Sequence, residues 1–84
     1  MQIYYFTAKF CGPCRKIKPI VESMVTEFPI RIVDIEEEPE LAQKYVVTSV
    51  PRFVFEENDE ISKQIIGFRS ETELRAEFTD FTSK

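Results

Sequence analysis

The residues of this chain best suited to redox chemistry are its only two cysteines, Cys11 and Cys14, in the sequence Cys-Gly-Pro-Cys. A disulfide between them closes too small a loop to staple distant segments together. A tetrahedral zinc site needs four ligands, and the chain has no histidine and no second cysteine pair. Zinc would have to be shared between subunits, so we expect no metal and no cofactor beyond the redox-active pair itself.

The position of the pair along the chain favours a reactive dithiol over two inert cysteines. Residues 2–6 are β-branched and aromatic and predict a strand, and a helical pattern follows the pair. The first turn of a helix has unpaired N–H groups and the positive end of the helix dipole, which both stabilise a thiolate. We therefore expect Cys11 to be an exposed nucleophile and Cys14 to be more buried, within reach of a mixed disulfide on Cys11. Pro13 fits the first turn, where its missing N–H costs nothing.

Further elements follow in close succession. The helix after the cysteines has one apolar face and is expected to end at Pro29, with a kink at Pro19. Residues 30–35 predict a strand apolar enough to be buried on both faces, and Pro39 suits the start of a short helix through about Tyr45. Two further strands are predicted at 52–56 and 61–66, joined by a polar turn around Asn58-Asp59. The last element is a helix that starts with a capping box at Ser70.

The order β-α-β-α-β-β-α implies an α/β fold with a four-stranded mixed sheet and helices on both faces. Its 84 residues suffice for one domain, residues 1–84, and not for two. A net charge of −4 argues against a nucleic-acid surface. The chain has no signal-peptide pattern and no apolar run near the roughly 20 residues that span a bilayer, so we expect no membrane partner and a cytoplasmic location.

Three segments carry a resemblance to a known family. Residues 10–16, Phe-Cys-Gly-Pro-Cys-Arg-Lys, followed by Pro19, resemble the active-site helix of thioredoxins. Residues 45–51, ending Ser-Val-Pro, look like the stretch before the cis-proline of that family, and Gly67 matches a glycine near the end of its last strand. The resemblance covers nearly the whole chain, without the extra N-terminal strand and helix of full-length thioredoxins. It describes a minimal version, as short as a glutaredoxin.

The resemblance implies a thioredoxin fold and a protein-disulfide reductase whose active-site loop includes Phe10, Gly12 and Pro13. It implies that Val50-Pro51 is a cis peptide facing the dithiol and pairing, near Gly67, with an extended substrate segment. The implied partners are protein disulfides and an NADPH-dependent thioredoxin reductase. The implied role is electron transport in cell redox homeostasis, carried out by a monomer.

The chain also departs from the family pattern. Phe10 replaces a tryptophan, which keeps apolar cover but loses an indole donor. Tyr5 stands where thioredoxins commonly carry a buried aspartate that helps deprotonate the second cysteine. We expect Tyr5 to serve packing, and Cys14 to be deprotonated by solvent or by the departing Cys11 thiolate. The nearest charges in the sequence, Lys9 and Arg52, can stabilise the Cys11 thiolate, although loop charges are more often simply solvated.

Two other functions are compatible with this pattern. Glutathione binding in glutaredoxins resembles a Val-Pro element plus a Gly-Gly pair and an aspartate before the last helix. Here Gly67 is followed by Phe68, which disfavours a glutaredoxin-like, glutathione-dependent reductase. The other alternative is an accessory binding subunit of a larger enzyme. An intact dithiol argues against a purely structural role, because packing alone does not require two cysteines at a helix start.

Overall fold

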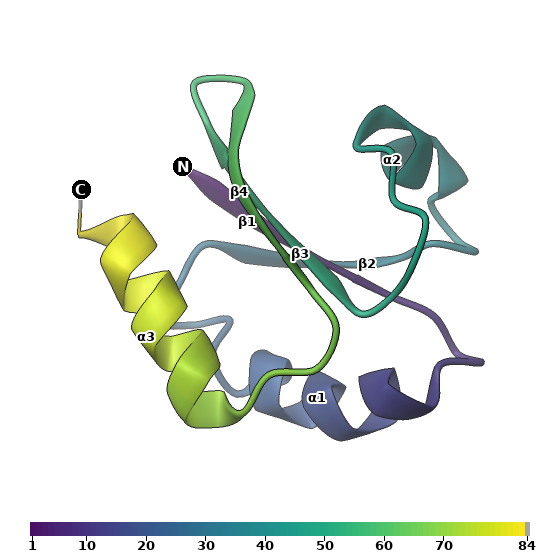
Figure 1. Cartoon of the computed structure of the whole chain (residues 1–84), viewed down its shortest axis with the longest axis horizontal. Coiled ribbons are helices and arrows are strands. Elements are labelled where there is room, and N and C mark those ends of the chain that lie inside the picture. Colours follow the sequence, from purple (N-terminus) through teal and green to yellow (C-terminus); the bar gives the residue numbers. More distant parts are fainter. Residues whose placement is uncertain (84) are drawn as a thin grey trace.

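The computed structural model describes residues 1–83, and its elements follow the expected order β-α-β-α-β-β-α (Figure 1). The elements are β1 (Gln2–Thr7), α1 (Gly12–Glu22), β2 (Ile30–Asp34), α2 (Pro39–Lys44), β3 (Arg52–Glu57), β4 (Glu60–Ile66) and α3 (Glu71–Thr82).

The four strands form one mixed sheet in the order β2-β1-β3-β4, which confirms the predicted fold class. β1 is parallel to β2 and antiparallel to β3, and β3 and β4 form an antiparallel hairpin. The hairpin turns at Asn58 and Asp59, which both have positive φ, at 51° and 64°. Two-residue hairpin turns with positive φ at both positions match the right-handed twist of the strands, and Asn and Asp tolerate that conformation.

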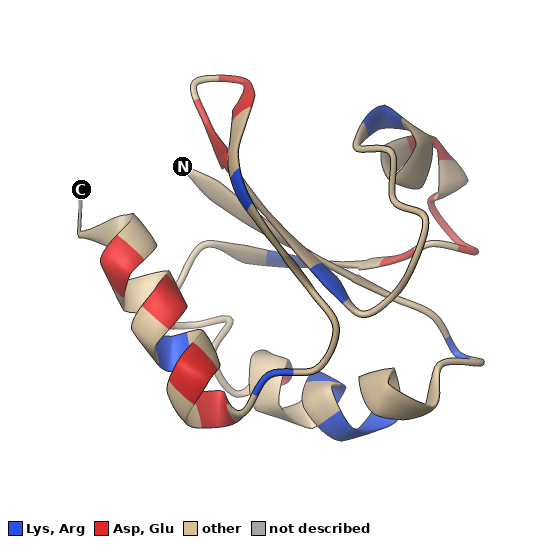
Figure 2. Ribbon diagram, in the orientation of Figure 1, with Lys and Arg blue, Asp and Glu red and all other residues tan. Residues whose placement is uncertain are grey.

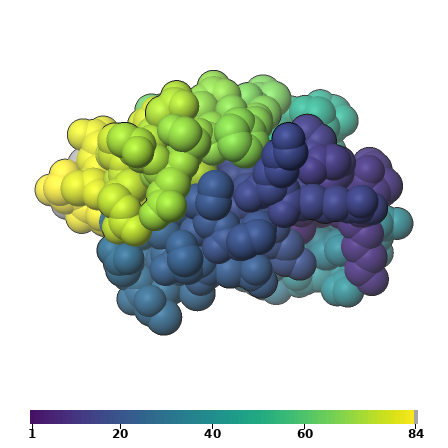
Figure 3. All heavy atoms as spheres, turned by 90° about the horizontal axis from the view of Figure 1, so that it is seen from below, coloured from purple at the N-terminus to yellow at the C-terminus, as the bar shows by residue number. Residues whose placement is uncertain are grey.

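Helices cover both faces of the sheet, as predicted. α1 and α3 lie on one face and α2 on the other (Figure 1). Seen from the side of α1 and α3, the two helices form one continuous surface (Figure 3). Because successive strand residues point to opposite faces, Tyr5 joins the core under α1 and α3, and Phe6 joins the core under α2. The larger core includes the aromatic residues Phe53, Phe55, Phe78 and Phe81.

α1 is shorter than the apolar pattern predicts. It ends at Glu22 and is followed by turns up to Phe28 instead of continuing to Pro29. The hydroxyl of Ser23 donates a hydrogen bond of 2.6 Å to the carbonyl of Ile20, and this local bond competes with helical continuation. Met24 is still buried in the core, although it lies in a turn. The apolar spacing therefore predicts burial correctly at this position but not helical structure.

The prediction that residues 30–35 are buried on both faces is wrong. β2 is an outer strand of the sheet, paired only with β1, and of its residues only Val33 is buried. Arg31, in the middle of the strand, is exposed and pairs with Glu38 at 2.5 Å. A central position in the sheet would have required apolar cover on both sides of the strand.

The capping box predicted at the last helix is present. The Glu73 N–H donates to the Ser70 hydroxyl at 3.2 Å, and the Ser70 N–H donates to the Glu73 carboxylate at 3.4 Å. α3 then buries the three apolar residues of its inner face, Leu74, Phe78 and Phe81. The box fixes where the helix begins, and so fixes the connection from β4 that carries Gly67 and Phe68.

Candidate active site

The two cysteines lie at the start of α1, just after the loop that follows β1. Cys11 is the N-cap of the helix and is joined to Cys14 by a disulfide, with 5.2 Å between their Cα atoms. The Cys14 N–H points at Cys11 Sγ, 3.2 Å away. In the reduced protein the same N–H is placed to donate to a Cys11 thiolate, as a helix N-terminus does for any anion.

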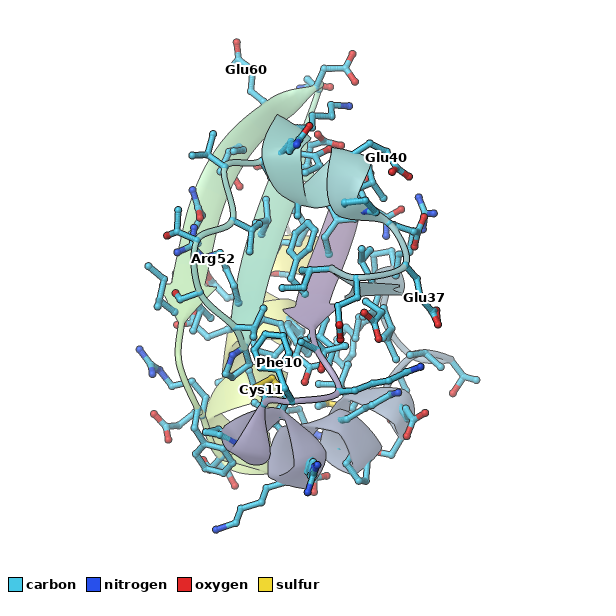
Figure 4. The ribbon with its side chains drawn as sticks, turned by 90° about the vertical axis from the view of Figure 1, so that its right-hand side faces the viewer. Phe10, Cys11, Glu37, Glu40, Arg52 and Glu60 are labelled. Carbon is cyan, nitrogen blue, oxygen red and sulfur yellow. A yellow bond between two sulfur atoms is a disulfide. The ribbon has the colours of Figure 1, made fainter. Side chains whose placement is uncertain are left out.

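The two cysteines differ in exposure in the expected order, but Cys11 is not an open surface residue. Cys11 is 6% exposed and Cys14 is 1% exposed. Val50 packs against Cys11, and both residues line a cavity of about 280 Å³ that Phe10 also borders. Phe10 itself is 70% exposed and projects beside Cys11 (Figure 4), as an outer apolar residue next to the dithiol.

Of the three residues predicted to bind substrate, Val50 lies at the dithiol, and Gly67 is hydrogen-bonded to the neighbouring Pro51. The Val50-Pro51 peptide is cis, as predicted. The Val50 carbonyl oxygen lies 3.6 Å from Cys11 Sγ, so a reduced Cys11 could donate to it. Gly67 donates its N–H to the Pro51 carbonyl at 3.0 Å and has a φ of 93°, which a residue with a Cβ rarely adopts.

Arg52 is not brought to Cys11. Its side chain is 7% exposed and lies beside the loop that follows α2, well separated from Cys11 (Figure 4). The guanidinium donates hydrogen bonds of 3.2–3.4 Å to the carbonyl of Val46 and to the side chains of Thr48, Ser49 and Gln64. Arg52 therefore anchors the loop that delivers Val50 to the dithiol.

Lys9 borders a different cavity, on the side of Cys14. This cavity, of about 230 Å³, is lined by Cys14 and by Thr7, Ala8, Lys9, Arg15, Lys18 and Asp34. Arg15, Lys18 and Asp34 were not predicted as site residues from the sequence. A signal for Asp34 was available, because it ends a strand parallel to β1, and the carboxyl ends of parallel neighbours meet at one edge of a sheet.

A third cavity opens on the outer side of the active-site loop. It has a volume of about 500 Å³ and is lined by Gly12, Pro13, Lys16 and Phe68. Phe68, which follows Gly67, is 47% exposed. Gly12 and Pro13, the two predicted loop residues, thus line a mostly apolar hollow together with Phe68. In the sequence, Phe68 stood out only as a departure from the glutaredoxin pattern.

Tyr5 is fully buried and stacks on Phe53, with ring centroids 4.9 Å apart. Burial raises the pKa of the Tyr5 phenol, and Glu22 raises it slightly further. The nearby Thr7 side chain lowers the Tyr5 pKa and offsets part of this increase. The Tyr5 hydroxyl nevertheless has no partner in hydrogen-bonding geometry. Tyr5 is therefore a neutral packing residue at neutral pH, as expected.

Two features are absent from residues 1–83. Within this part of the chain, no group of three or more His, Cys, Asp or Glu side chains is arranged to hold a metal ion. None of its helices has the length and apolar character needed to cross a membrane.

Comparison with known proteins decides the family. The family model described as Thioredoxin matches residues 1–80. The chain belongs to the thioredoxin family. With the disulfide at the start of α1, this membership identifies it as a thiol–disulfide oxidoreductase.

Individual thioredoxins support the assignment. The chain is 36% identical over 69 residues to an H-type thioredoxin of Oryza sativa subsp. indica, covering 79% of this chain and 57% of the rice protein. It is 34% identical over 73 residues to a thioredoxin of Listeria monocytogenes, covering 82% and 71%. The X-ray structure of Fasciola hepatica thioredoxin superposes with a TM-score of 0.81 at 38% identity, covering 94% of this chain and 78% of that one. The chain is thus shorter than each of these relatives.

Proposed function

We propose that the chain reduces protein disulfides, with Cys11 as the nucleophile and Cys14 as the resolving thiol. The observation that carries this proposal is the placement of Cys11 at the N-cap of α1, with the Cys14 N–H aimed at its sulfur. Cys11 attacks a substrate disulfide and forms a mixed disulfide. Cys14 then attacks Cys11, which releases the reduced substrate and leaves the Cys11–Cys14 disulfide.

The substrate docks as an extended segment beside the dithiol. The backbone of Val50 and Pro51 borders Cys11 and is suited to pairing with such a segment, as in strand addition. The apolar hollow between Pro13 and Phe68 receives a side chain of the same substrate. Backbone pairing accepts many sequences, so this surface suits a reductase of broad specificity.

The oxidised protein is returned to the dithiol by an NADPH-dependent thioredoxin reductase, and the protein acts as a monomer in the cytoplasm. Family membership supports the reductase as partner. A dithiol reductant needs a compartment that keeps thiols reduced, which supports the location. In this role the chain carries electrons from NADPH to protein disulfides and serves cell redox homeostasis.

The test is insulin disulfide reduction, recycled either by purified thioredoxin reductase with NADPH or by glutathione with glutathione reductase. We expect turnover with the first system and little with the second, and none with Cys11→Ser. Turnover supported only by glutathione would favour the glutaredoxin-like alternative. Retention of biological function by the double variant Cys11→Ser, Cys14→Ser would favour the accessory-subunit alternative.

A further inference from the structure

The resolving step requires Cys14 to lose its proton, and Tyr5 does not accept it. Burial raises the pKa of the Tyr5 phenol, so that group is protonated at neutral pH. Cys14 is 1% exposed and lines a cavity of about 230 Å³. The proton acceptor should therefore lie on that cavity. The inference that follows rests on the proposed function, in which Cys14 is the resolving thiol.

Cys14 and Asp34 line the same cavity, at the edge of the sheet where β1 and β2 both end. Its volume is about 230 Å³, and a water molecule takes about 30 Å³, so several waters fit. Its lining surface is mostly apolar, but it includes Thr7, Lys9, Arg15, Lys18 and Asp34, whose polar groups can hydrogen-bond water. A chain of water can thus connect the Cys14 sulfur to the Asp34 carboxylate.

The Asp34 carboxylate is held in place and still has capacity to accept. Its Oδ1 accepts the Glu36 N–H at 2.8 Å, which fixes the side chain at the end of β2. Within residues 1–83 no hydrogen bond to Oδ2 is formed. The charged groups that face the cavity besides Asp34 are Lys9, Arg15 and Lys18, and their positive charges stabilise a thiolate forming there.

We propose that Asp34 is the proton acceptor for Cys14, through water in this cavity. The Cys14 thiol gives its proton to a cavity water, which passes a proton to Asp34 Oδ2. The Cys14 thiolate attacks Cys11 Sγ, the Cys11–Cys14 bond forms, and the bond from Cys11 to the substrate sulfur breaks. The electron pair of that bond leaves on the substrate sulfur, which takes a proton from solvent, and Asp34 later returns its proton to solvent. The cysteine pair is oxidised by two electrons and the substrate is reduced by two.

The substitution Asp34→Asn separates this role from a simple effect of charge. Asparagine keeps an oxygen for the Glu36 N–H, so the local structure is retained. Removing a negative charge near Cys14 would by electrostatics alone make its thiolate easier to form and speed resolution. Removing a proton acceptor slows resolution. The two explanations therefore predict changes of opposite sign.

The experiment follows the Cys11 mixed disulfide in a single turnover of the reduced protein with a peptide disulfide, by rapid quenching and mass spectrometry. At pH 7 we expect Asp34→Asn to slow the resolving step about tenfold or more and to change the first attack less than twofold. The deficit should vanish above about pH 9, where thiols ionise without help. Glu37→Gln is the matched control, because Glu37 is exposed and lies away from Cys11 at the edge of the molecule (Figure 4), and it should resolve normally.

A resolving step in Asp34→Asn that is as fast as in the parent protein, or faster, would overturn the proposal and leave solvent or the departing substrate thiolate as acceptor. Equal slowing in Glu37→Gln would also overturn it. As a second variant, Asp34→Ala should be slow and should regain rate when acetate is added, whereas acetate should not change the parent rate. Failure of the proposed function would look different, because no Cys11 adduct would form in any variant.

Discussion

At the scale of single residues, the dithiol is asymmetric before any substrate arrives. Cys11 caps α1 and borders the cavity beside Phe10, whereas Cys14 borders the cavity that Asp34 also lines. Each sulfur therefore communicates with solvent through its own opening. This difference in access supports the proposed roles, attack by Cys11 and resolution by Cys14.

Replacing the resolving thiol should trap the first intermediate. In Cys14→Ser we expect the Cys11 attack to proceed and the substrate to remain attached, because no second thiol can displace it. Intact-mass measurement after mixing with a peptide disulfide should show one substrate adduct on Cys11. Adducts that instead gather on Cys14 in the reciprocal variant Cys11→Ser would mean that the two roles are reversed.

Tyr5 gives a second prediction at this scale. Its hydroxyl is buried without a hydrogen-bond partner, so Tyr5→Phe should leave reductase turnover unchanged and raise the free energy of unfolding by about 1 kcal/mol. Because burial raises the Tyr5 pKa, the unfolded chain ionises first as the pH rises through about 10, and stability falls from there upward. Denaturant unfolding at several pH values should show a smaller alkaline loss in Tyr5→Phe. A large loss of turnover with the fold intact would show that the hydroxyl takes part in the reaction.

At the scale of elements, the loop between α2 and β3 decides the shape of the site. Val50 is delivered to Cys11 by this loop, and the loop is held by the buried fork of Arg52. Neither fact follows from local sequence pattern. Arg52 is next to the predicted cis-proline, which suggests proximity to the dithiol, but its side chain points to the face of the sheet that carries α2.

A conservative change at Arg52 tests whether its geometry or its charge matters. Arg52→Lys keeps the charge but cannot reproduce several hydrogen bonds from one planar group. We expect faster hydrogen exchange of the loop amides and a severalfold rise in KM for insulin, with little change in the pH at which the Cys11 thiolate forms. If Arg52→Lys behaves like the parent protein while Arg52→Met shifts that pH upward, the charge is what matters and the anchoring role is wrong.

Much of the architecture could be predicted because its signals are local. The capping box at Ser70, the turn at Asn58-Asp59 and the cysteines between a strand and a helix each depend on neighbours in the chain. The early end of α1 at Glu22 has a local cause, the hydrogen bond of the Ser23 hydroxyl, but the other errors concern contacts between distant segments. The outer position of β2 depends on strand order, and the low exposure of Cys11 depends on Val50, which is 39 residues away. The meeting of Asp34 with Cys14 likewise needs the register of β1 and β2.

At the scale of the whole molecule, charge is unevenly distributed. The chain carries a net charge of −4, but basic side chains gather on α1, beside the dithiol (Figure 2). Lys9, Arg15, Lys16 and Lys18 all border one of the cavities next to the cysteines. Acidic residues occur along α3, in the hairpin and before α2 (Figure 2). Most charged residues bordering these cavities are thus opposite in sign to the net charge.

This distribution predicts which substrates the protein attacks fastest. A peptide disulfide flanked by aspartate should have a higher kcat/KM than the same peptide flanked by lysine, because the basic side of α1 attracts it. The ratio should fall toward one between about 0.01 M and 0.5 M salt, as screening shortens from about 30 Å to a few ångströms. A ratio that does not change with salt would show that the difference comes from short-range contacts and not from this field.

The two outer strands have a consequence for behaviour at high concentration. β2 and β4 each leave one row of backbone N–H and C=O groups unpaired in the sheet, and such rows can template stacking into fibrils. Each outer strand carries a charged side chain that disfavours such pairing and that is itself in an ion pair. On β2 this is Arg31, paired with Glu38, and on β4 it is Lys63, paired with Glu77. We expect Arg31→Val, which adds a β-branched residue to an exposed edge, to raise thioflavin fluorescence and light scattering on storage, whereas Arg31→Lys should not. These charged side chains, which look incidental in so small a sheet, would then prevent strands of other molecules from adding to its edges.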